Sequence, residues 1–376
     1  RHAEGKRRGL FQGRGLGILG GEGRQVDYRT EPSVIRTCRR SAFGHVEMTR
    51  LTSFESRELD ETAHIAEMTD ILRRKMERDY EKGNTRRDAH PKTVALLKGS
   101  FQIEPDLPKS LRVGIFAKPA SHACWVRFSN SSGKLQSDAV KDARGVAIKL
   151  LEAKADGRNA DTPLGQDFVL LSSPVMPLGT VALFRDAVYY TVESSPVLMA
   201  AKFIMTGKAG VLLGLLGLRI SPNSLLDIRY WSTTPYLFGK GRAVKYSLLP
   251  TSKHHSRNSD AAADDYLTKV MQAHLNRHEA SFDLCIQLQK DGMPIEDASV
   301  EWSEEESPFI KVATLRIPSQ KFRTKERAEL AESLSFSPGN ALREHAPLGG
   351  LNRARIAIYK SLTSFRHRRD SRINIE

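Results

Sequence analysis

Short runs of β-type residues follow one another from residue 93 to residue 317, and this pattern constrains the fold more than any other feature of the sequence. In these runs apolar residues alternate with polar ones, or β-branched residues gather. Turn-forming clusters, such as residues 130–133 and 156–159, divide several of them. The predicted strands are residues 93–103, 123–130, 145–151, 167–172, 243–249, 282–288 and 309–317. Many short strands with few helices between them predict an antiparallel barrel of the α+β class.

Helical periodicity surrounds and interrupts this strand-rich region. Residues 55–82 place apolar side chains at helical spacing and end at Gly83, a common helix stop. Residues 353–366 contain neither Gly nor Pro, so that a helix can run through them unbroken. Three more helices are predicted at residues 181–192, 263–278 and 324–333. Residues 1–47 are rich in Gly and Arg, so we expect them to be disordered and residues 48–376 to form the folded domain.

The chain of 376 residues carries a formal charge of +14, which favours negatively charged partners such as nucleic acid. Much of the excess, however, lies at the two ends, and the middle contains no helix-turn-helix, zinc-finger or RNA-binding signature. We therefore expect no nucleic-acid partner. The cysteines, Cys38, Cys124 and Cys285, are far apart in the sequence and predict neither a zinc ribbon nor a disulfide framework. A reducing compartment, and so a cytoplasmic location, is the simplest expectation.

The longest apolar stretch, residues 197–220, is interrupted by Lys202 and Lys208. Its uninterrupted part, residues 209–218, is too short to span a bilayer. We expect a buried or hairpin segment. An interfacial contact with lipid is the alternative, and it would matter if the substrate were a lipid.

Three side chains of the predicted helix at residues 353–366 share one face. At about 100° per residue, Arg355, Tyr359 and Arg366 fall within roughly 40° of one another. A guanidinium one turn from a phenol favours the ionised phenolate, and phenolate is a hard anionic ligand for ferric iron. Arg366 could meet a porphyrin propionate. The alternative is an ordinary surface helix with a half-buried tyrosine.

A second candidate lies where the first helix has ended and the strands are about to begin, in the sequence Arg87-Asp-Ala-His90-Pro. A histidine that points into a cavity can act as an acid–base catalyst, because its near-neutral pKa lets it carry a proton in both directions. The alternative is a surface or core histidine bonded to backbone. Four other histidines lack acidic or cysteine partners in a metal-binding pattern, and we expect them to face solvent. They are His254, His255, His274 and His278.

Alternation along residues 124–130 sends Trp125, Arg127 and Ser129 to one face of the predicted strand and apolar side chains to the other. An Arg/Ser face is ordinary for solvent, so an outward strand face is one interpretation. The other is the wall of a cavity, with Arg127 on an anion and Ser129 bonded to the histidine.

Taken in order, these pieces resemble the heme catalase superfamily, and its short, divergent catalase-related peroxidases more than the full-length monofunctional catalases. The resemblance covers roughly residues 55–369. It implies an eight-stranded antiparallel barrel with heme between the barrel and flanking helices. The motifs are Arg87-x-x-His90, Val126-Arg-Phe-Ser129, Lys141-Asp-Ala-Arg-Gly-Val-Ala-Ile-Lys149, Phe336-Ser-Pro-Gly-Asn340 and Arg355-x-x-x-Tyr359-x6-Arg366.

The resemblance also implies heme b, with its iron, as the cofactor, and it gives roles to the candidate residues. His90 would be the distal histidine above the heme, and Ser129 its hydrogen-bonding support. Tyr359 would be the proximal metal ligand, assisted by Arg355. The residues that would hold the propionates are Arg87, Arg127 and Arg366.

In one respect the sequence departs from the family. Catalases have a distal Asn in a Gly-Asn-Asn-Thr-Pro-like segment, where this chain has Pro163-Leu-Gly-Gln-Asp-Phe168. Neither Leu164 nor Gly165 can donate a side-chain hydrogen bond, which leaves Gln166 as the candidate replacement. The chain also ends soon after the proximal helix, like a catalase core without the C-terminal domain and its nucleotide site.

The implied function is a heme-dependent oxidoreductase that acts on hydrogen peroxide or an organic hydroperoxide, a catalase-like peroxidase suited to oxidative stress. A peroxidase needs a small-molecule electron donor, whereas a catalase uses a second peroxide. Two alternatives stay open. One is a fatty-acid hydroperoxide isomerase or dehydratase like allene oxide synthase, and the other is a heme-binding protein without catalytic activity. Assembly into a homo-oligomer is a further expectation.

Overall fold

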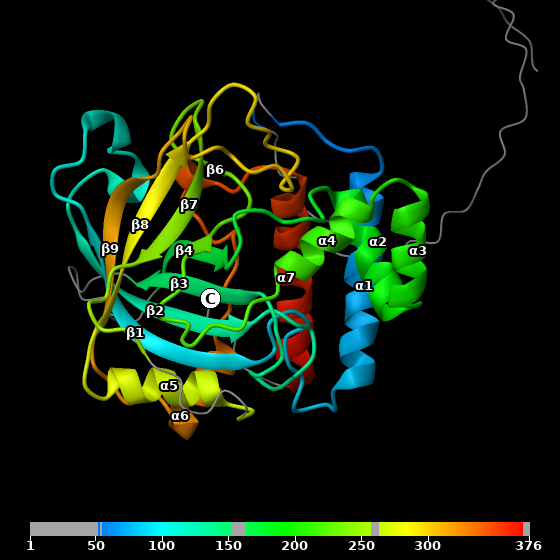
Figure 1. The fold of residues 1–376 in the computed structure, drawn as a ribbon, viewed down its shortest axis with the longest axis horizontal. Helices are drawn as coiled ribbons and strands as arrows, with labels where there is room; N and C mark the ends of the chain where they lie inside the picture. Colours follow the sequence, from blue (N-terminus) through cyan, green and yellow to red (C-terminus); the bar gives the residue numbers. More distant parts are fainter. Residues whose placement is uncertain (1–51, 53–54, 152–162, 257–262, 371–376) are drawn as a thin grey trace, which may run out of the picture. The chain divides into compact units, whose positions relative to one another are not determined.

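The seven predicted strands and the short β5, which was not predicted, form a closed antiparallel barrel (Figure 1). Around the ring the order is β5-β4-β3-β2-β1-β9-β8-β7, and the pairing of β5 with β7 joins the two ends. The short strand β6 also pairs with β7. The strands are β1 (Thr93–Ile103), β2 (Ser121–Asn130), β3 (Arg144–Leu151), β4 (Pro163–Leu171), β5 (Tyr230–Trp231), β6 (Tyr236–Leu237), β7 (Ala243–Pro250), β8 (Ala280–Leu288) and β9 (Ile310–Ile317). The α+β class and the eight-stranded barrel are thus confirmed.

The computed structural model describes residues 52, 55–151, 163–256 and 263–370. The described residues all belong to one compact unit. The predicted disorder of residues 1–47 lies outside the described residues and stays a prediction, as does the domain boundary that follows it.

Apolar side chains fill the inside of the barrel, because alternation turns one side of every strand inward. On β2, Cys124, Val126 and Phe128 point into this core, which contains most of the buried apolar residues of the barrel. The rings of Phe101 and Phe168 stack there at 5.5 Å between centroids. Burying each such ring contributes about 1.5–3 kcal/mol. Any ligand cavity must therefore lie outside the strands.

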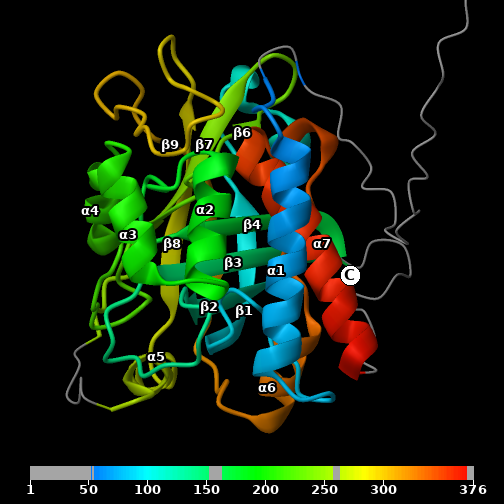
Figure 2. The same ribbon diagram turned by 90° about the vertical axis from the view of Figure 1, so that its right-hand side faces the viewer.

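A layer of helices covers one outer side of the barrel, where α7 (Gly350–Asp370) packs with α1 (Glu61–Asp79) and α2 (Val181–Val192) (Figure 2). The helices α3 (Pro196–Met205) and α4 (Ala209–Gly217) follow α2. On another side α5 (Tyr266–Leu275) and α6 (Lys325–Ser333) contact β1. Short 3-10 turns complete the described elements at Lys109–Leu111, Gly114–Phe116 and Arg343–His345.

Both ends of α7 are held by charged groups from distant parts of the chain. Near its start the buried Arg353 contacts the carboxylates of Glu55 at 2.7 Å, Glu61 at 2.8 Å and Glu296 at 3.0 Å. At its end the carboxylate of Asp370 accepts hydrogen bonds from the backbone N–H of Thr85 at 2.8 Å and from its hydroxyl at 2.7 Å. The helix is therefore fixed to the segments on either side of α1.

Two helices are shorter than the periodicity predicts. The predicted helix at residues 55–82 spans only Glu61–Asp79, because the residues before it serve other elements. Glu58, for example, accepts hydrogen bonds from the first two backbone N–H groups of α2, at 2.7 and 3.0 Å, and so caps that helix. The predicted helix at residues 263–278 spans Tyr266–Leu275.

The apolar segment at residues 197–220, expected to be either buried or a hairpin, is a hairpin with little burial. It folds as the hairpin of α3 and α4, and α4 has no buried residue although it consists only of Ala, Gly, Val and Leu. No helix in the described part of the chain is both long and apolar enough to cross a bilayer. The expectation of burial is thus wrong for α4.

One of the four histidines expected to face solvent is buried. His274 on α5 is 3 % exposed, and its Nδ1 lies 2.9 Å from the hydroxyl oxygen of Ser256. The rings of His254 and His278 stack at 4.0 Å between centroids and remain exposed. His274 lies on the buried side of α5 together with Met271 and Leu275, whereas His254, His255 and His278 lie outside the helix and are exposed.

Candidate active site

A cavity of about 410 Å³ lies between the outside of the barrel and the helical layer. One side is formed by β2, β3, β4 and the loop that carries His90, and we call it the barrel wall. The other side is α7, the helix wall, and side chains of α1, α2 and α4 complete the lining. All seven predicted site residues line this cavity: Arg87, His90, Arg127, Ser129, Arg355, Tyr359 and Arg366.

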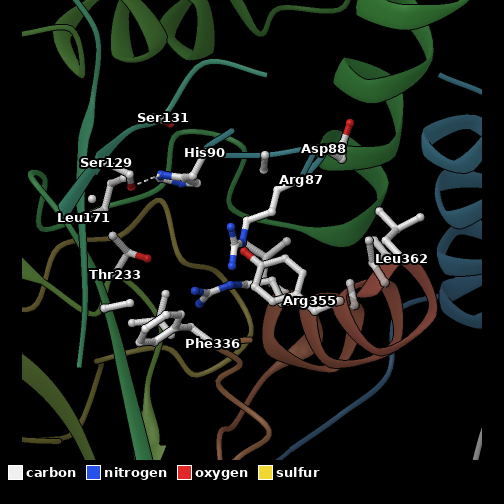
Figure 3. A pocket seen from close by; sticks show the side chains of 18 of the residues that line it. Arg87, Asp88, His90, Ser129, Ser131, Leu171, Thr233, Phe336, Arg355 and Leu362 are labelled. Atoms are coloured by element: carbon white, nitrogen blue, oxygen red, sulfur yellow. Dashed lines mark hydrogen bonds between the residues drawn. The ribbon is translucent and has the colours of Figure 1, made fainter. Parts of the chain in front are cut away.

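His90 is held on the barrel wall by its neighbours. It precedes Pro91 and adopts a left-handed backbone conformation, with a φ of 57°, which is uncommon for a residue other than glycine and is often found at functional sites. Its Nδ1 lies 3.0 Å from the hydroxyl oxygen of Ser129 on β2 (Figure 3). Burial lowers the pKa of His90 to about 3, with further contributions from Arg127 and Arg355. The imidazole is therefore neutral at physiological pH.

Gly145 on β3 makes room for this histidine. A Cβ atom at Gly145 would lie 2.8 Å from Cε1 of His90 and 3.1 Å from the Ser129 hydroxyl oxygen. Both distances are shorter than ordinary van der Waals contacts, so any side chain there would displace the imidazole. The glycine of the 141–149 motif therefore has a steric function beside His90.

Arg127 supports the His90 loop. Its guanidinium donates to the backbone carbonyl of His90 at 2.7 Å and to the hydroxyl of Thr93 at 2.8 Å. Burial lowers the pKa of Arg127 well below its ordinary value, and the nearby Arg87 adds to this effect. Of the two interpretations of the Arg127/Ser129 face, the structure shows the cavity wall, formed by the outer face of the barrel under the helices.

Cations also gather at one end of the cavity around Glu332, the second-last residue of α6. The guanidinium of Arg87 lies 3.4 Å from one carboxylate oxygen of Glu332, and that of Arg366 lies 3.7 Å from the same oxygen. Arg87 also donates to the carbonyl of Ala331 at 2.8 Å. Three arginines, counting Arg127, thus gather near one acid, and this excess of positive charge suits an anionic ligand group.

On the helix wall Arg355 lies over the ring of Tyr359, with 5.8 Å from the guanidinium carbon to the ring centroid. The same guanidinium donates to Asn352 at 3.1 Å and to Thr234 at 3.3 Å. Burial lowers the pKa of Arg355, but interactions with Tyr359 and Tyr236 outweigh it, so that the pKa is raised overall. Arg355 is therefore a permanent cation next to the phenol.

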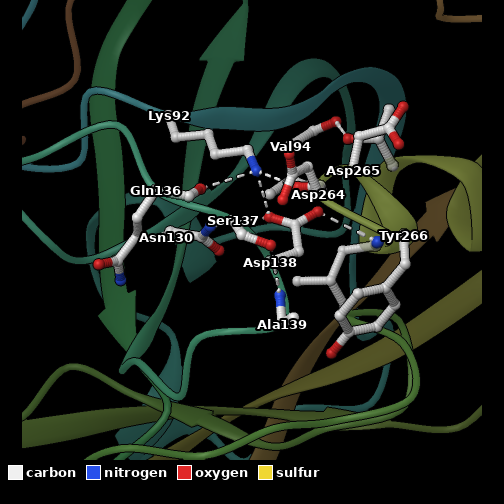
Figure 4. Close-up of polar contacts among 12 residues, drawn as sticks. Lys92, Val94, Asn130, Gln136, Ser137, Asp138, Ala139, Asp264, Asp265 and Tyr266 are labelled. Carbon is white, nitrogen blue, oxygen red and sulfur yellow. Dashed lines mark hydrogen bonds and ion pairs between the residues drawn. The ribbon is translucent and has the colours of Figure 1, made fainter. Parts of the chain in front are cut away.

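A buried polar network stands behind the barrel wall (Figure 4). The carboxylate of Asp138 lies 2.8 Å from the ammonium of Lys92 and accepts from the Asn130 amide at 2.8 Å. It also accepts from the backbone N–H of Leu267 on α5, at 3.1 Å. Since Lys92 follows His90 by two residues and Asn130 follows Ser129, the network fixes the strands that carry both groups. Arg144 joins it by donating to the side-chain amide oxygen of Asn130.

Gln166, the candidate replacement for a distal amide, does not line the cavity. The side chain of Gln166 accepts from the backbone N–H of Leu342 at 3.1 Å and donates to the carbonyl of Asp167 at 3.1 Å. The part of β4 that lines the cavity is Val169 to Leu171. Leu171 pairs with Gly145 across the sheet and is seen near Ser129 in Figure 3. The residue of β4 that lies opposite Gly145, the glycine beside His90, is thus apolar.

The motif at residues 336–340 connects β4 to the cavity. The backbone N–H of Ser337 donates to Asp167 at 3.0 Å, and the carbonyl of Asn340 accepts from the N–H of Asp167 at 2.7 Å. Asp167 is itself paired with the buried Lys149 at 3.0 Å. These contacts bring Phe336 to the cavity lining, a position that residue type alone did not predict.

Comparison with solved structures finds close matches in fold. A fungal catalase matches with a TM-score of 0.61 and 18% identity over 75% of this chain and 59% of its own. Catalase A from Saccharomyces cerevisiae matches with a TM-score of 0.61 and 16% identity, over 75% of this chain and 61% of its own. A bacterial catalase matches with a TM-score of 0.59 and 15% identity, over 88% of this chain and 67% of its own. The chain has the catalase fold. No protein-family model and no curated protein matches its sequence.

The match extends over about three fifths of the length of the first two catalases. At this level of identity the likeness concerns the fold, and function has to be argued from the cavity itself. Its lining fits heme in three respects. A phenol next to a cation can serve as an iron ligand, three arginines can meet acidic propionates, and leucine, valine and phenylalanine side chains suit the flat apolar ring.

Proposed function

We propose that this protein is a heme-dependent oxidoreductase that acts on hydrogen peroxide or an organic hydroperoxide. The observation that carries the proposal is that His90 and Tyr359 line one cavity, each supported by a polar neighbour. The catalase fold supports it as well. Heme b is the cofactor that we propose for the cavity.

The chain's own residues divide the task of holding this cofactor. Tyr359 would ligate the iron through its phenolate oxygen, with the cation of Arg355 lying over its ring. Arg87 and Arg366 would meet the propionates, because both line the cavity and surround a single carboxylate. Arg127 would add charge there while its hydrogen bonds hold the His90 loop.

Heme bound here would supply the redox chemistry that cleaves the oxygen–oxygen bond. His90 would move the proton. With a hydrogen on Nδ1 donated to Ser129, the lone pair of Nε2 is available to accept a proton from the hydroperoxyl group. Burial and the nearby Arg127 and Arg355 lower the pKa of His90 to about 3, which weakens the imidazole as a base and makes the imidazolium a strong acid that would readily return the proton to the departing oxygen.

The absorption spectrum of the heme-loaded protein tests the proximal assignment. We expect a high-spin ferric spectrum in the parent and a changed spectrum in Tyr359→Phe, because the mutation removes the ligating oxygen. Tyr80→Phe is the matched control, since Tyr80 packs in the same helical layer without lining the cavity. An identical spectrum in Tyr359→Phe and the parent would show that the iron is held elsewhere.

A lipid hydroperoxide isomerase or dehydratase is the second candidate, and the apolar surroundings of His90 favour it. Leu171 offers no hydrogen bond to a second peroxide, and Leu215 and Leu218 extend the apolar lining toward α4. Measuring oxygen release from hydrogen peroxide against the loss of diene absorbance of a fatty-acid hydroperoxide separates the two activities. A protein that binds heme and changes neither substrate would be a heme carrier without catalytic function.

A further inference from the structure

The hairpin of α3 and α4 is apolar on two sides. Its inner side packs on α2 through Phe203, which is fully buried, and through the half-buried Val211, Leu212 and Leu215. Its outer side exposes six large apolar side chains by more than half. They are Val197 (75 %), Leu198 (56 %), Ile204 (60 %), Met205 (86 %), Leu213 (71 %) and Leu216 (61 %).

Such a concentration is unusual for a surface in contact with water alone. Elsewhere in the described part of the chain, large exposed apolar residues are mostly scattered one by one, as Leu59 and Leu135 are. Here they gather on two short helices that contact each other at the outside of the helical layer (Figure 2). A helix that is apolar all round is normally buried, and a contiguous exposed apolar patch marks a binding surface.

The charges of the hairpin indicate what it binds. Residues 194–220 contain three cations, Lys202, Lys208 and Arg219, and no acidic residue. Lys202 forms an ion pair with Asp186 of α2 at 2.8 Å. Lys208 lies between the two helices and Arg219 just after α4, and both are exposed. Apolar side chains next to exposed cations are the combination that binds anionic lipid headgroups and the acyl region beneath them.

We propose that the hairpin of α3 and α4 docks on an anionic membrane surface, with its outer apolar side chains in the headgroup and upper acyl region. At ten and nine residues the two helices are far too short to span the bilayer, so the hairpin lies in the interface. A second copy of the chain is a poorer occupant, because two such surfaces would bring the exposed Lys208 and Arg219 of both copies together.

The position of the cavity indicates what docking of the hairpin would achieve. Leu215 packs on α2 and also lines the cavity, as does Leu218 just after α4. A docked hairpin would therefore place the apolar side of the cavity next to the acyl chains. That the molecule admitted there is the hydroperoxide of a membrane lipid rests on the function proposed above, whereas docking itself requires no heme.

Sedimentation with vesicles tests the docking. The full chain is mixed with phosphatidylcholine vesicles and with vesicles of phosphatidylcholine and phosphatidylglycerol. We expect binding to the anionic vesicles, and a loss of affinity of roughly tenfold for each leucine removed in Leu213→Ser/Leu216→Ser. Neither leucine lines the cavity, so the heme spectrum should not change. Leu59→Ser/Leu135→Ser is the matched control, since it removes two exposed leucines elsewhere and should bind like the parent.

The basic segment of residues 1–47 is present in every variant. Vesicle binding that depends on this segment alone would be equal in the parent and in the hairpin variant. Equal binding would therefore overturn the proposal. It would also be overturned if the parent did not bind, or if gel filtration showed a dimer that the leucine substitutions dissociate. Lys208→Glu provides a second variant with little risk to folding, because Lys208 is exposed. It should weaken binding roughly tenfold on anionic vesicles and leave binding to neutral vesicles unchanged.

Discussion

On the barrel wall each polar side chain is held by its own hydrogen bonds. On the helix wall the side chains take their positions from the anchoring of α7 as a whole. On the barrel wall, His90 contacts Ser129, and Arg127 holds the backbone of His90. On the helix wall, Tyr359 takes its position from a helix anchored far away, at Arg353 and Asp370. The difference suggests that proton transfer requires an accurately placed atom, while a metal ligand can rely on the rigidity of its helix.

The largest effect should come from His90→Gln, which removes proton transfer on the barrel wall and leaves the helix wall intact. We expect the rate of peroxide consumption to fall by about two to four orders of magnitude. The ferric spectrum, which reports Tyr359, should keep its iron ligation. Stopped-flow kinetics and absorption spectra provide the two measurements. If both changed together, the two walls would not act independently.

Arg353→Met should disturb the helix wall from a distance. The mutation leaves the carboxylates of Glu55 and Glu61, both nearly buried, without their cation, and we expect unfolding free energy to fall by about 3–5 kcal/mol. Arg73→Met is the control, because the ion pairs of Arg73 are exposed and contribute less than about 1 kcal/mol. Urea denaturation measures both. Equal losses in the two variants would mean that α7 is not anchored at Arg353.

Acid should destabilise the protein through the barrel wall. The pKa of His90 is about 3 in the folded protein and near 6.5 in the unfolded chain, so the unfolded chain binds more protons between these values. Stability is therefore full above about pH 6.5 and is lost as the pH falls toward 3. Between about pH 7 and pH 5 the loss due to His90 should be about 2 kcal/mol. His90→Gln should show a correspondingly flatter profile, although His345, whose pKa is lowered to about 4 by burial, still titrates in both proteins.

The smallest of these effects concerns the position on β4 that faces the histidine. Leu171→Asn introduces an amide donor next to His90 and should raise oxygen release from hydrogen peroxide by about tenfold. Gln166→Ala is the comparison, because Gln166 bonds to Leu342 and Asp167 away from the cavity. It should lower stability by about 1–2 kcal/mol without changing oxygen release. The opposite pattern would assign the distal position to Gln166.

Much of the fold could be predicted because the barrel strands and the main helices have clear periods. The strands β5 and β6 have two residues each and are too short to show any period, although β5 closes the ring. The exposure of α4 could not be predicted either, since a run of Val, Leu and Gly resembles a buried segment in every local respect. One side of α4 is uncovered only because α4 packs against α2 with its other side.

The site residues came from short motifs in a fixed order, and the structure brings all of them to one cavity. The roles assigned to them stay predictions. Residue type misled at one position, because Gln166 can donate a hydrogen bond and Leu171 looks like an ordinary core residue. The register of β3 and β4 decides the matter: Leu171 lies opposite Gly145, which touches His90. Pairing between strands, unlike composition, cannot be read from one segment alone.

The anchoring of α7 at both ends also bears on how substrate enters. A helix held only at one end could rotate away from the barrel, but α7 is held by Arg353 near its start and by Asp370 at its end. The helix wall of the cavity therefore keeps its position relative to the barrel. Substrate would have to enter beside α7, and we expect its path to run past the apolar side chains of α2 and α4, such as Phe184 and Leu215, which line the cavity.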